Sequence, residues 1–181
     1  MKGISGLDSR HPSCVPILIL GLGSTLLSDD GVGPVILAAL RQQYGEKDSR
    51  VEFLDGGTQG LNLLGLLDGR RALIILDALQ LGKEPGTVTV LDSPELQKLG
   101  AHRAGTAHEG NAGELLAAAA ILGDLPDQLF VVGVEPLRLR TGIGLSEPVQ
   151  AAVPQAAAQA MQLIAHAAAL LNPGSNLPVH R

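Results

Sequence analysis

The segment from Ile17 to Pro34 constrains the fold of this chain more than any other part of the sequence. An apolar run, Ile-Leu-Ile-Leu, ends in a Gly-Leu-Gly turn, and two adjacent aspartates follow. Apolar residues then recur at helical spacing from Val32 to Leu40. The order of strand, glycine-rich turn and helix predicts the opening of an α/β domain whose binding edge lies at this turn. Because carboxylates stand at its mouth, the turn suits a cation or a proton better than a phosphate.

Length and composition limit the architecture and the partners. A chain of 181 residues is long enough for one well-buried domain and too short for two. It is 45% hydrophobic but only 2% aromatic, so small aliphatic side chains must build the core. Such a core fits a parallel sheet covered by helices. The net charge of −5 and the absence of any basic block argue against a nucleic-acid partner.

The single cysteine, Cys14, excludes an internal disulfide and an all-thiolate zinc site. We therefore expect a reducing, cytoplasmic setting. The apolar run at 15–20 is too short to span a membrane, which argues against a membrane partner. We also expect the protein to be a monomer.

Strands and helices are predicted to alternate along the chain. Apolar runs predict strands at 15–22, 51–54, 72–76, 87–91 and 129–134. Helices are expected from Val32, at 59–67, at 111–122 and from Ser146 to Leu171, with Pro148 in the first turn of the last helix. Pro154 is expected to kink or delay that helix.

This pattern predicts an α/β fold: a single three-layer domain with a twisted, mostly parallel, five-stranded sheet and helices on both faces. The short turn-like link before 87–91 indicates that this strand is antiparallel to its neighbour. We expect a flexible extension at 1–14, the domain at 15–171 and a flexible tail at 172–181.

Acidic residues gather where the predicted strands end. Asp30, Asp55, Asp77 and Glu135 stand at or just after such ends, and His108 lies in a glycine-broken loop before a helix. Ligands of open α/β sheets bind beyond the carboxyl ends of the strands. Two carboxylates and one histidine from separate loops would form a three-ligand site with open positions, suited to Ni, Zn, Mn or Fe.

Each carboxylate also has a structural interpretation. Either Asp29 or Asp30 could cap the following helix, which would leave the other one free. Asp77 could bond nearby loop N–H groups, Asp55 precedes a Gly-Gly turn, and Glu135 precedes a proline. No serine or cysteine stands in a nucleophile-elbow context, so covalent catalysis has no support in the sequence.

Several motifs in order resemble those of the hydrogenase maturation endopeptidases, which process the large subunit of nickel–iron hydrogenases. The resemblance runs from about residue 15 to about residue 171, and it rests on Gly21-x-Gly23-x5-Asp29-Asp30-Gly31-x-Gly33, Asp55-Gly56-Gly57-Thr58, Asp77-Ala78 and His108.

The resemblance implies that two acidic residues and one histidine recognise nickel, and by position these are Asp30, Asp77 and His108. It further implies a single cut that removes the C-terminal extension of the nickel-loaded precursor large subunit. The nickel would arrive with the substrate, and the free enzyme would hold none tightly. We expect metal-assisted hydrolysis, with one of the carboxylates or Asp55 as general base. Asp29, Asp55 and Glu135 form a second tier of candidates.

Two other functions would each explain part of the sequence. A dinucleotide-binding oxidoreductase would explain the Gly-x-Gly turn and Asp55, which lies where a ribose-binding acid would sit. However, Leu26 occupies the third glycine position of that fingerprint, and Asp29 and Asp30 would repel a pyrophosphate. A non-catalytic chaperone of metal-centre assembly, docking through an apolar surface, would leave the acidic clustering unexplained.

Overall fold

The computed structural model describes residues 15–45, 48–96 and 112–171. The predictions made for 1–14, including Cys14, and for 172–181 lie outside the described residues. In chain order the elements are β1 (Ile17–Leu22), η1 (Ser28–Gly31), α1 (Val32–Tyr44), β2 (Val51–Gly57), η2 (Gly60–Leu66), β3 (Ala72–Ala78), β4 (Val88–Asp92), α3 (Ala112–Leu122), β5 (Gln128–Val134) and α4 (Glu147–Leu170).

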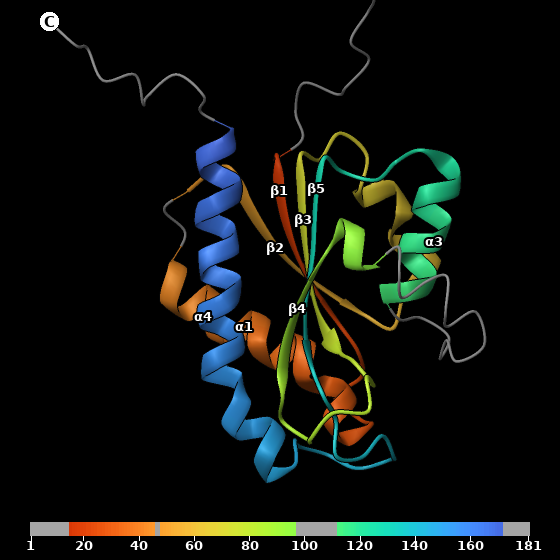
Figure 1. The fold of residues 1–181 in the computed structure, drawn as a ribbon, viewed down its shortest axis with the longest axis vertical. Helices are drawn as coiled ribbons and strands as arrows, with labels where there is room; N and C mark the ends of the chain where they lie inside the picture. Colours follow the sequence, from red (N-terminus) through yellow and green to blue (C-terminus); the bar gives the residue numbers. More distant parts are fainter. Residues whose placement is uncertain (1–14, 46–47, 97–111, 172–181) are drawn as a thin grey trace, which may run out of the picture.

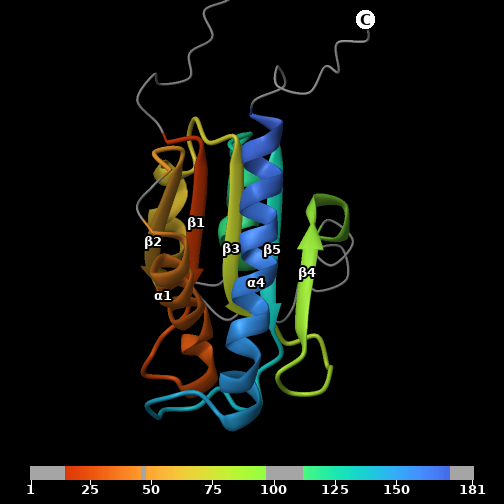
Figure 2. The same cartoon turned by 90° about the vertical axis from the view of Figure 1, so that its left-hand side faces the viewer.

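The five strands form one sheet in the order β2-β1-β3-β5-β4. All neighbouring strands are parallel except β4, which runs antiparallel to β5. Helices α1 and α4 cover one face of the sheet, and η2 and α3 cover the other (Figure 1). The predicted three-layer α/β domain with one antiparallel strand is therefore confirmed. The partner of β4 is β5 rather than the preceding strand, so β4 lies at an edge of the sheet (Figure 2).

The apolar runs of the central strands fill both layers of the core. Ile17 and Ile19 of β1 pack with α1 and α4, whereas Leu18 and Leu20 pack with η2 and α3. All four side chains are fully buried. A central parallel strand is covered on both faces, which is why its sequence is continuously apolar rather than alternating.

The connections between strands create one crevice at the carboxyl edge of the sheet. From β1 the chain passes through α1 on one face to β2, and then through η2 on the other face to β3. The order therefore reverses between β1 and β3, and ligands of open α/β sheets bind at such a switch point. The turn after β1 and the last residues of β3 both lie there.

Three local predictions differ from the structure. Strand β2 continues past Leu54 to Gly57, because a bulge at Gly56 keeps it paired with β1. The segment after it, predicted as an ordinary helix at 59–67, is the 3₁₀ helix η2. Helix α4 runs from Glu147 through Pro154 without a break, so that proline does not delay it.

In the described ranges no helix combines the length and the apolar character needed to cross a membrane.

Candidate active site

The Gly-x-Gly turn brings Asp30 back against the end of β1. Gly23 has a φ of +110°, and a Cβ there would collide with the backbone carbonyl of Asp30. The Ser24 N–H donates a hydrogen bond of 2.7 Å to Oδ2 of Asp30. A backbone N–H of this turn therefore donates to a carboxylate of the same chain. In a nucleotide-binding loop the corresponding N–H would donate to a phosphate.

Asp77 is the penultimate residue of β3 and is only 3% exposed. Its Oδ1 accepts the N–H of Ala78 at 2.8 Å, and its Oδ2 accepts the N–H of Ala112, the first residue of α3, at 3.2 Å. The structural interpretation of Asp77 is thus correct in part, because the carboxylate holds the start of α3. These two bonds also fix where the carboxylate points.

Asp30 and Asp77 are brought together electrostatically. Burial raises the pKa of the Asp77 carboxyl to about 7, even though the N–H groups of Ala112 and Ala78 favour its charged form. The negative charge of Asp30 raises this pKa further. Two carboxylates from neighbouring strand ends thus repel one another at the switch point, and a cation bound between them would offset that repulsion.

The third predicted ligand, His108, lies outside the described residues, as does its loop. In the ranges that are described, no three metal-binding side chains gather at one place. The structure therefore shows two carboxylates of the predicted set and leaves the histidine as a prediction.

Asp29 has a different role from the one predicted for it. Neither aspartate caps α1, whose N-cap residue is Gly31. The fully buried carboxylate of Asp29 instead accepts hydrogen bonds from the N–H groups of Leu137, Arg138 and Ser146, at 2.6 to 3.0 Å. The Ser146 hydroxyl donates a fourth bond, of 2.9 Å. Burial alone would raise the pKa of Asp29, but the bonds from Ser146, Arg138 and Leu137 hold it below its usual value.

The remaining carboxylates serve nearby loops. Asp55 is exposed on β2, and its Oδ1 accepts the N–H of Gly57 at 3.0 Å, as in a local turn. Glu135 is buried after β5, and its oxygens accept the N–H groups of Leu81 at 2.7 Å and Gly82 at 3.2 Å. Both stand at the carboxyl edge as predicted, but their described bonds are those of loop anchors.

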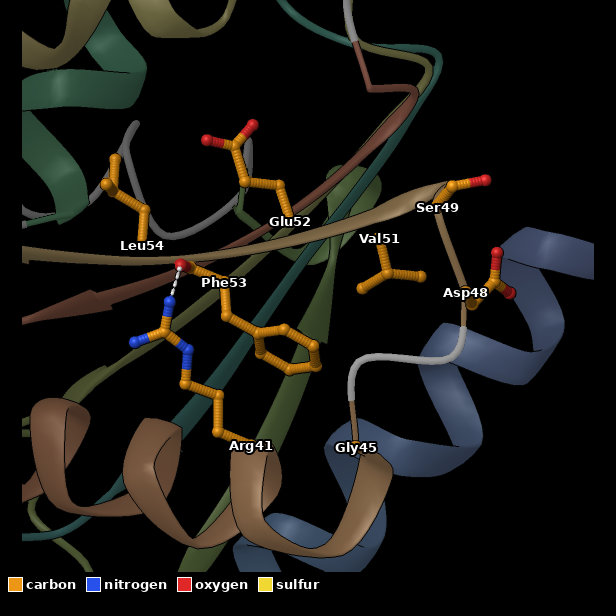
Figure 3. Close-up of a pocket in the computed structure, with 8 residues that line it drawn as sticks. All are labelled: Arg41, Gly45, Asp48, Ser49, Val51, Glu52, Phe53 and Leu54. Carbon is orange, nitrogen blue, oxygen red and sulfur yellow. Dashed lines mark hydrogen bonds between the residues drawn. The ribbon is translucent and has the colours of Figure 1, made fainter.

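A hollow lies elsewhere, between the last turn of α1 and the edge strand β2 (Figure 3). The Arg41 guanidinium crosses it and donates to the carbonyl of Phe53 at 3.1 Å. Asp48 on its rim is paired with Arg50 at 2.7 Å. None of the five predicted carboxylates lines this hollow, so it does not belong to the candidate site.

Comparison with known proteins agrees with the geometry. A family model described as hydrogenase maturation protease matches residues 34–163. The chain belongs to this family. It is 39% identical over 146 residues to the hydrogenase 2 maturation protease of Escherichia coli (strain K12), across 80% of this chain and 88% of that protein. It is 35% identical over 154 residues to the hydrogenase expression/formation protein HupD of Rhizobium leguminosarum bv. viciae, across 84% and 76%.

Solved structures of the family share the fold. The hydrogenase maturating endopeptidase HybD from E. coli is 35% identical, with a TM-score of 0.72 across 83% of this chain and 92% of that chain. The hydrogenase 2 maturation peptidase from Thaumarchaeota archaeon SCGC_AB-539-E09 is 27% identical, with a TM-score of 0.62 across 82% and 97%. The prediction that this chain is a peptidase is therefore confirmed, and the match favours it over the oxidoreductase and chaperone alternatives.

Sequence reasoning missed the residues that position the site from a distance. Ser146 is the N-cap residue of α4, but its hydroxyl donates to Asp29 and makes no capping bond to the helix. Asp77 was not expected to reach Ala112, which lies 35 residues along the chain. No local pattern marks such pairs. The one available signal is that two adjacent aspartates after a strand cannot both point toward the same ligand.

Proposed function

We propose that this protein is an endopeptidase that removes the C-terminal extension from the nickel-loaded precursor large subunit of a nickel–iron hydrogenase. The observation that carries this proposal is the pair of mutually repelling carboxylates, Asp30 and Asp77, at the switch point of a hydrogenase maturation protease fold. The relatives compared above are hydrogenase maturation proteins, and the resemblance of the sequence motifs implies the same substrate. We place the reaction in the cytoplasm, because a chain with one cysteine forms no internal disulfide and fits a reducing compartment.

In this proposal nickel is part of the substrate. The precursor carries the ion, and Asp30, Asp77 and His108 fill coordination positions that the precursor leaves open. Carboxylate oxygens and an imidazole nitrogen suit Ni²⁺, as they suit Zn²⁺ and other ions of intermediate softness. Because the two carboxylates repel one another, a cation is favoured between them, whereas three ligands alone hold it weakly in the free enzyme. The enzyme thereby distinguishes a loaded precursor from an empty one.

The chemical step is hydrolysis of one peptide bond. The oxygen of a water molecule attacks the scissile carbonyl carbon, and a carboxylate oxygen of the pair that does not hold the ion accepts a proton from that water. The carbon–nitrogen bond then breaks, and the proton passes to the departing amine. Burial raises the pKa of the Asp77 carboxyl to about 7 in the metal-free protein, and a carboxylate with such a pKa suits the role of proton acceptor. A nickel ion held by Asp30, Asp77 and His108 would position the scissile bond and would polarise its carbonyl or the water.

The experiment is incubation of the purified protein with precursor large subunit in nickel-loaded and nickel-free forms. Intact-mass spectrometry follows loss of the C-terminal extension. We expect one cut in the loaded precursor and none in the empty one. Equal cleavage of both forms would contradict nickel recognition, and the absence of cleavage with every hydrogenase precursor would contradict the proposed activity.

A further inference from the structure

Two loops beside the candidate site expose large apolar side chains. The turn between β1 and η1 presents Leu26 and Leu27, and the loop between β5 and α4 presents Leu137 and Ile143. Leu26 is 63% exposed, Leu137 is 53% exposed and Ile143 is 89% exposed. Large aliphatic side chains gathered on a surface mark a contact with another molecule more often than isolated ones do.

These side chains belong to one joined surface because the backbones of the two loops are bonded. The Gly142 N–H donates to the carbonyl of Leu26 at 3.0 Å, and the Ser28 N–H donates to the carbonyl of Gly142 at 2.8 Å. The buried carboxylate of Asp29 adds four bonds to the same second loop. Both loops lie at the end of the sheet where β1 and β3 finish, at the bottom of Figure 1. The exposed apolar side chains therefore stand on loops that hydrogen bonds fix in place.

The same surface carries positive charge. Arg138 and Arg140 are exposed on the second loop. Neither guanidinium has a hydrogen bond or an ion pair with any residue in the described part of the chain. The whole chain has a net charge of −5, so two unpaired arginines beside four aliphatic side chains are a local departure from it. Such a surface is complementary to a segment with apolar and acidic side chains.

The surface is also continuous with the carboxylate pair. Asp30 follows Leu27 by three residues, and Asp29 links the segment between them to Leu137 and Arg138. A polypeptide whose scissile bond lies at Asp30 and Asp77 must leave the site across a neighbouring surface, and this one adjoins it directly.

We propose that Leu26, Leu27, Leu137, Arg138, Arg140 and Ile143 form a docking surface for an apolar, acidic segment of the precursor polypeptide. This inference rests on the proposed function, since it takes that precursor as the substrate. The apolar side chains bury against the segment, while the two arginines attract its carboxylates and fix its direction. In this arrangement the carboxylate pair recognises the metal, and the docking surface binds the protein that carries the metal.

The test measures equilibrium binding of the full-length protein to nickel-loaded precursor, separately from cleavage. One double variant, Leu137→Ser with Ile143→Ser, removes apolar contact, and another, Arg138→Glu with Arg140→Glu, reverses the charge. Exposed residues tolerate such changes, and unchanged circular dichroism and thermal unfolding will establish that both variants fold. We expect each double variant to bind about tenfold more weakly, with a raised KM.

One matched control makes the same apolar-to-serine change at another place, and the other keeps the two positive charges. Ile121→Ser with Leu122→Ser alters two side chains that are 86% and 61% exposed at the end of α3, and it should bind as the wild type does. Arg138→Lys with Arg140→Lys keeps the charge and should bind within a few-fold of the wild type.

The outcomes separate this inference from the proposed function. If the wild type binds the precursor but never cleaves it, the proposed function fails, and the binding of the variants still decides the docking surface. If the wild type binds and both docking variants bind equally well, the docking surface is refuted. Failure of the wild type to bind refutes both. A wild-type dimer that Ile143→Ser dissociates would assign the surface to a second copy and overturn the inference.

Discussion

Asp29 and Asp30 are adjacent in the chain, yet their carboxylates have different hydrogen-bond partners and different roles. Asp29 is fully buried, and four donors from the β5–α4 loop and the start of α4 satisfy it. Asp30 accepts the Ser24 N–H and adds its charge to the environment of Asp77. Both residues lie in the 3₁₀ helix η1, and their side chains bind different loops. At the residue scale, Asp29 anchors the loops around the candidate site, and Asp30 stays a predicted member of that site.

The raised pKa of Asp77 predicts a pH-dependent stability. In the unfolded chain the carboxyl ionises near 3.8, whereas in the folded protein it holds its proton up to about 7. The folded state therefore binds more protons across this window, and the free energy of unfolding falls as the pH rises through it, by roughly 1 kcal/mol per pH unit at most. Asp77→Asn lacks this contribution. Urea unfolding of both proteins at several pH values between about 5 and 8 measures the difference.

For Asp77 the informative quantity is the wild type minus variant difference in unfolding free energy, because other groups titrate equally in both proteins. We expect this difference to decrease from pH 5 to pH 7 and to level off above it. A difference that stays constant across the whole range would show that the carboxyl is already ionised at pH 5.

Gly33 is predicted to resist substitution although it lies in a helix. In an ordinary helix Gly→Ala stabilises by about 1 kcal/mol. Here a Cβ would overlap the carbonyl oxygens of Leu22 and Leu76, at the ends of β1 and β3. We expect Gly33→Ala to lower the free energy of unfolding by roughly 1–3 kcal/mol, measured by urea unfolding. The control is Gly65→Ala, where a Cβ meets no atom within 4 Å. A Gly33→Ala protein as stable as the wild type would refute the close approach.

At the scale of elements, the site depends on loops that are joined through one side chain. Asp29 connects η1 to the loop after β5 and to the first residues of α4. Asp77 connects β3 to the start of α3. The two carboxylates thereby fix four elements around the switch point. The docking surface depends on the first of these connections.

Removal of the Asp29 carboxylate should loosen both loops. Asp29→Ala leaves the N–H groups of Leu137, Arg138 and Ser146 without their acceptor, and we expect a loss of about 3 kcal/mol or more in unfolding free energy. Hydrogen exchange at these three amides should accelerate. Asp55→Ala, the control, removes one exposed bond to Gly57 and should cost less than about 1 kcal/mol. Equal losses in the two variants would contradict the joining role of Asp29.

At the scale of the whole molecule, the sequence predicts elements that have a local apolar pattern and misses contacts between residues far apart in the chain. The continuous apolar runs of β1 and β3 identify buried parallel strands, because both of their faces are covered. The end of β2 was missed because a Gly-Gly pair reads as a turn, whereas here it forms a bulge. The pairing of β4 with β5 was not predicted, because no local sequence pattern in either strand indicates its partner.

The candidate site follows the same rule. Asp30 and Asp77 were predicted from their places after two strands, since strand ends meet at one edge of a parallel sheet. The anchoring bonds of Asp29 to residues 137–146 were not predicted, because they join residues more than 100 positions apart. The family match then supports the peptidase without assigning a role to any of these residues.

The central claim is that Asp30 and Asp77 together read nickel on the substrate, and the rate of cleavage of nickel-loaded precursor tests it most directly. We expect Asp30→Asn and Asp77→Asn each to lower this rate by about 100-fold or more, because the neutral amide is a poor nickel ligand and a poor base. Asp55→Asn, an exposed carboxylate at the same edge of the sheet, should stay within a few-fold of the wild type. Wild-type rates in Asp30→Asn or Asp77→Asn would contradict the account.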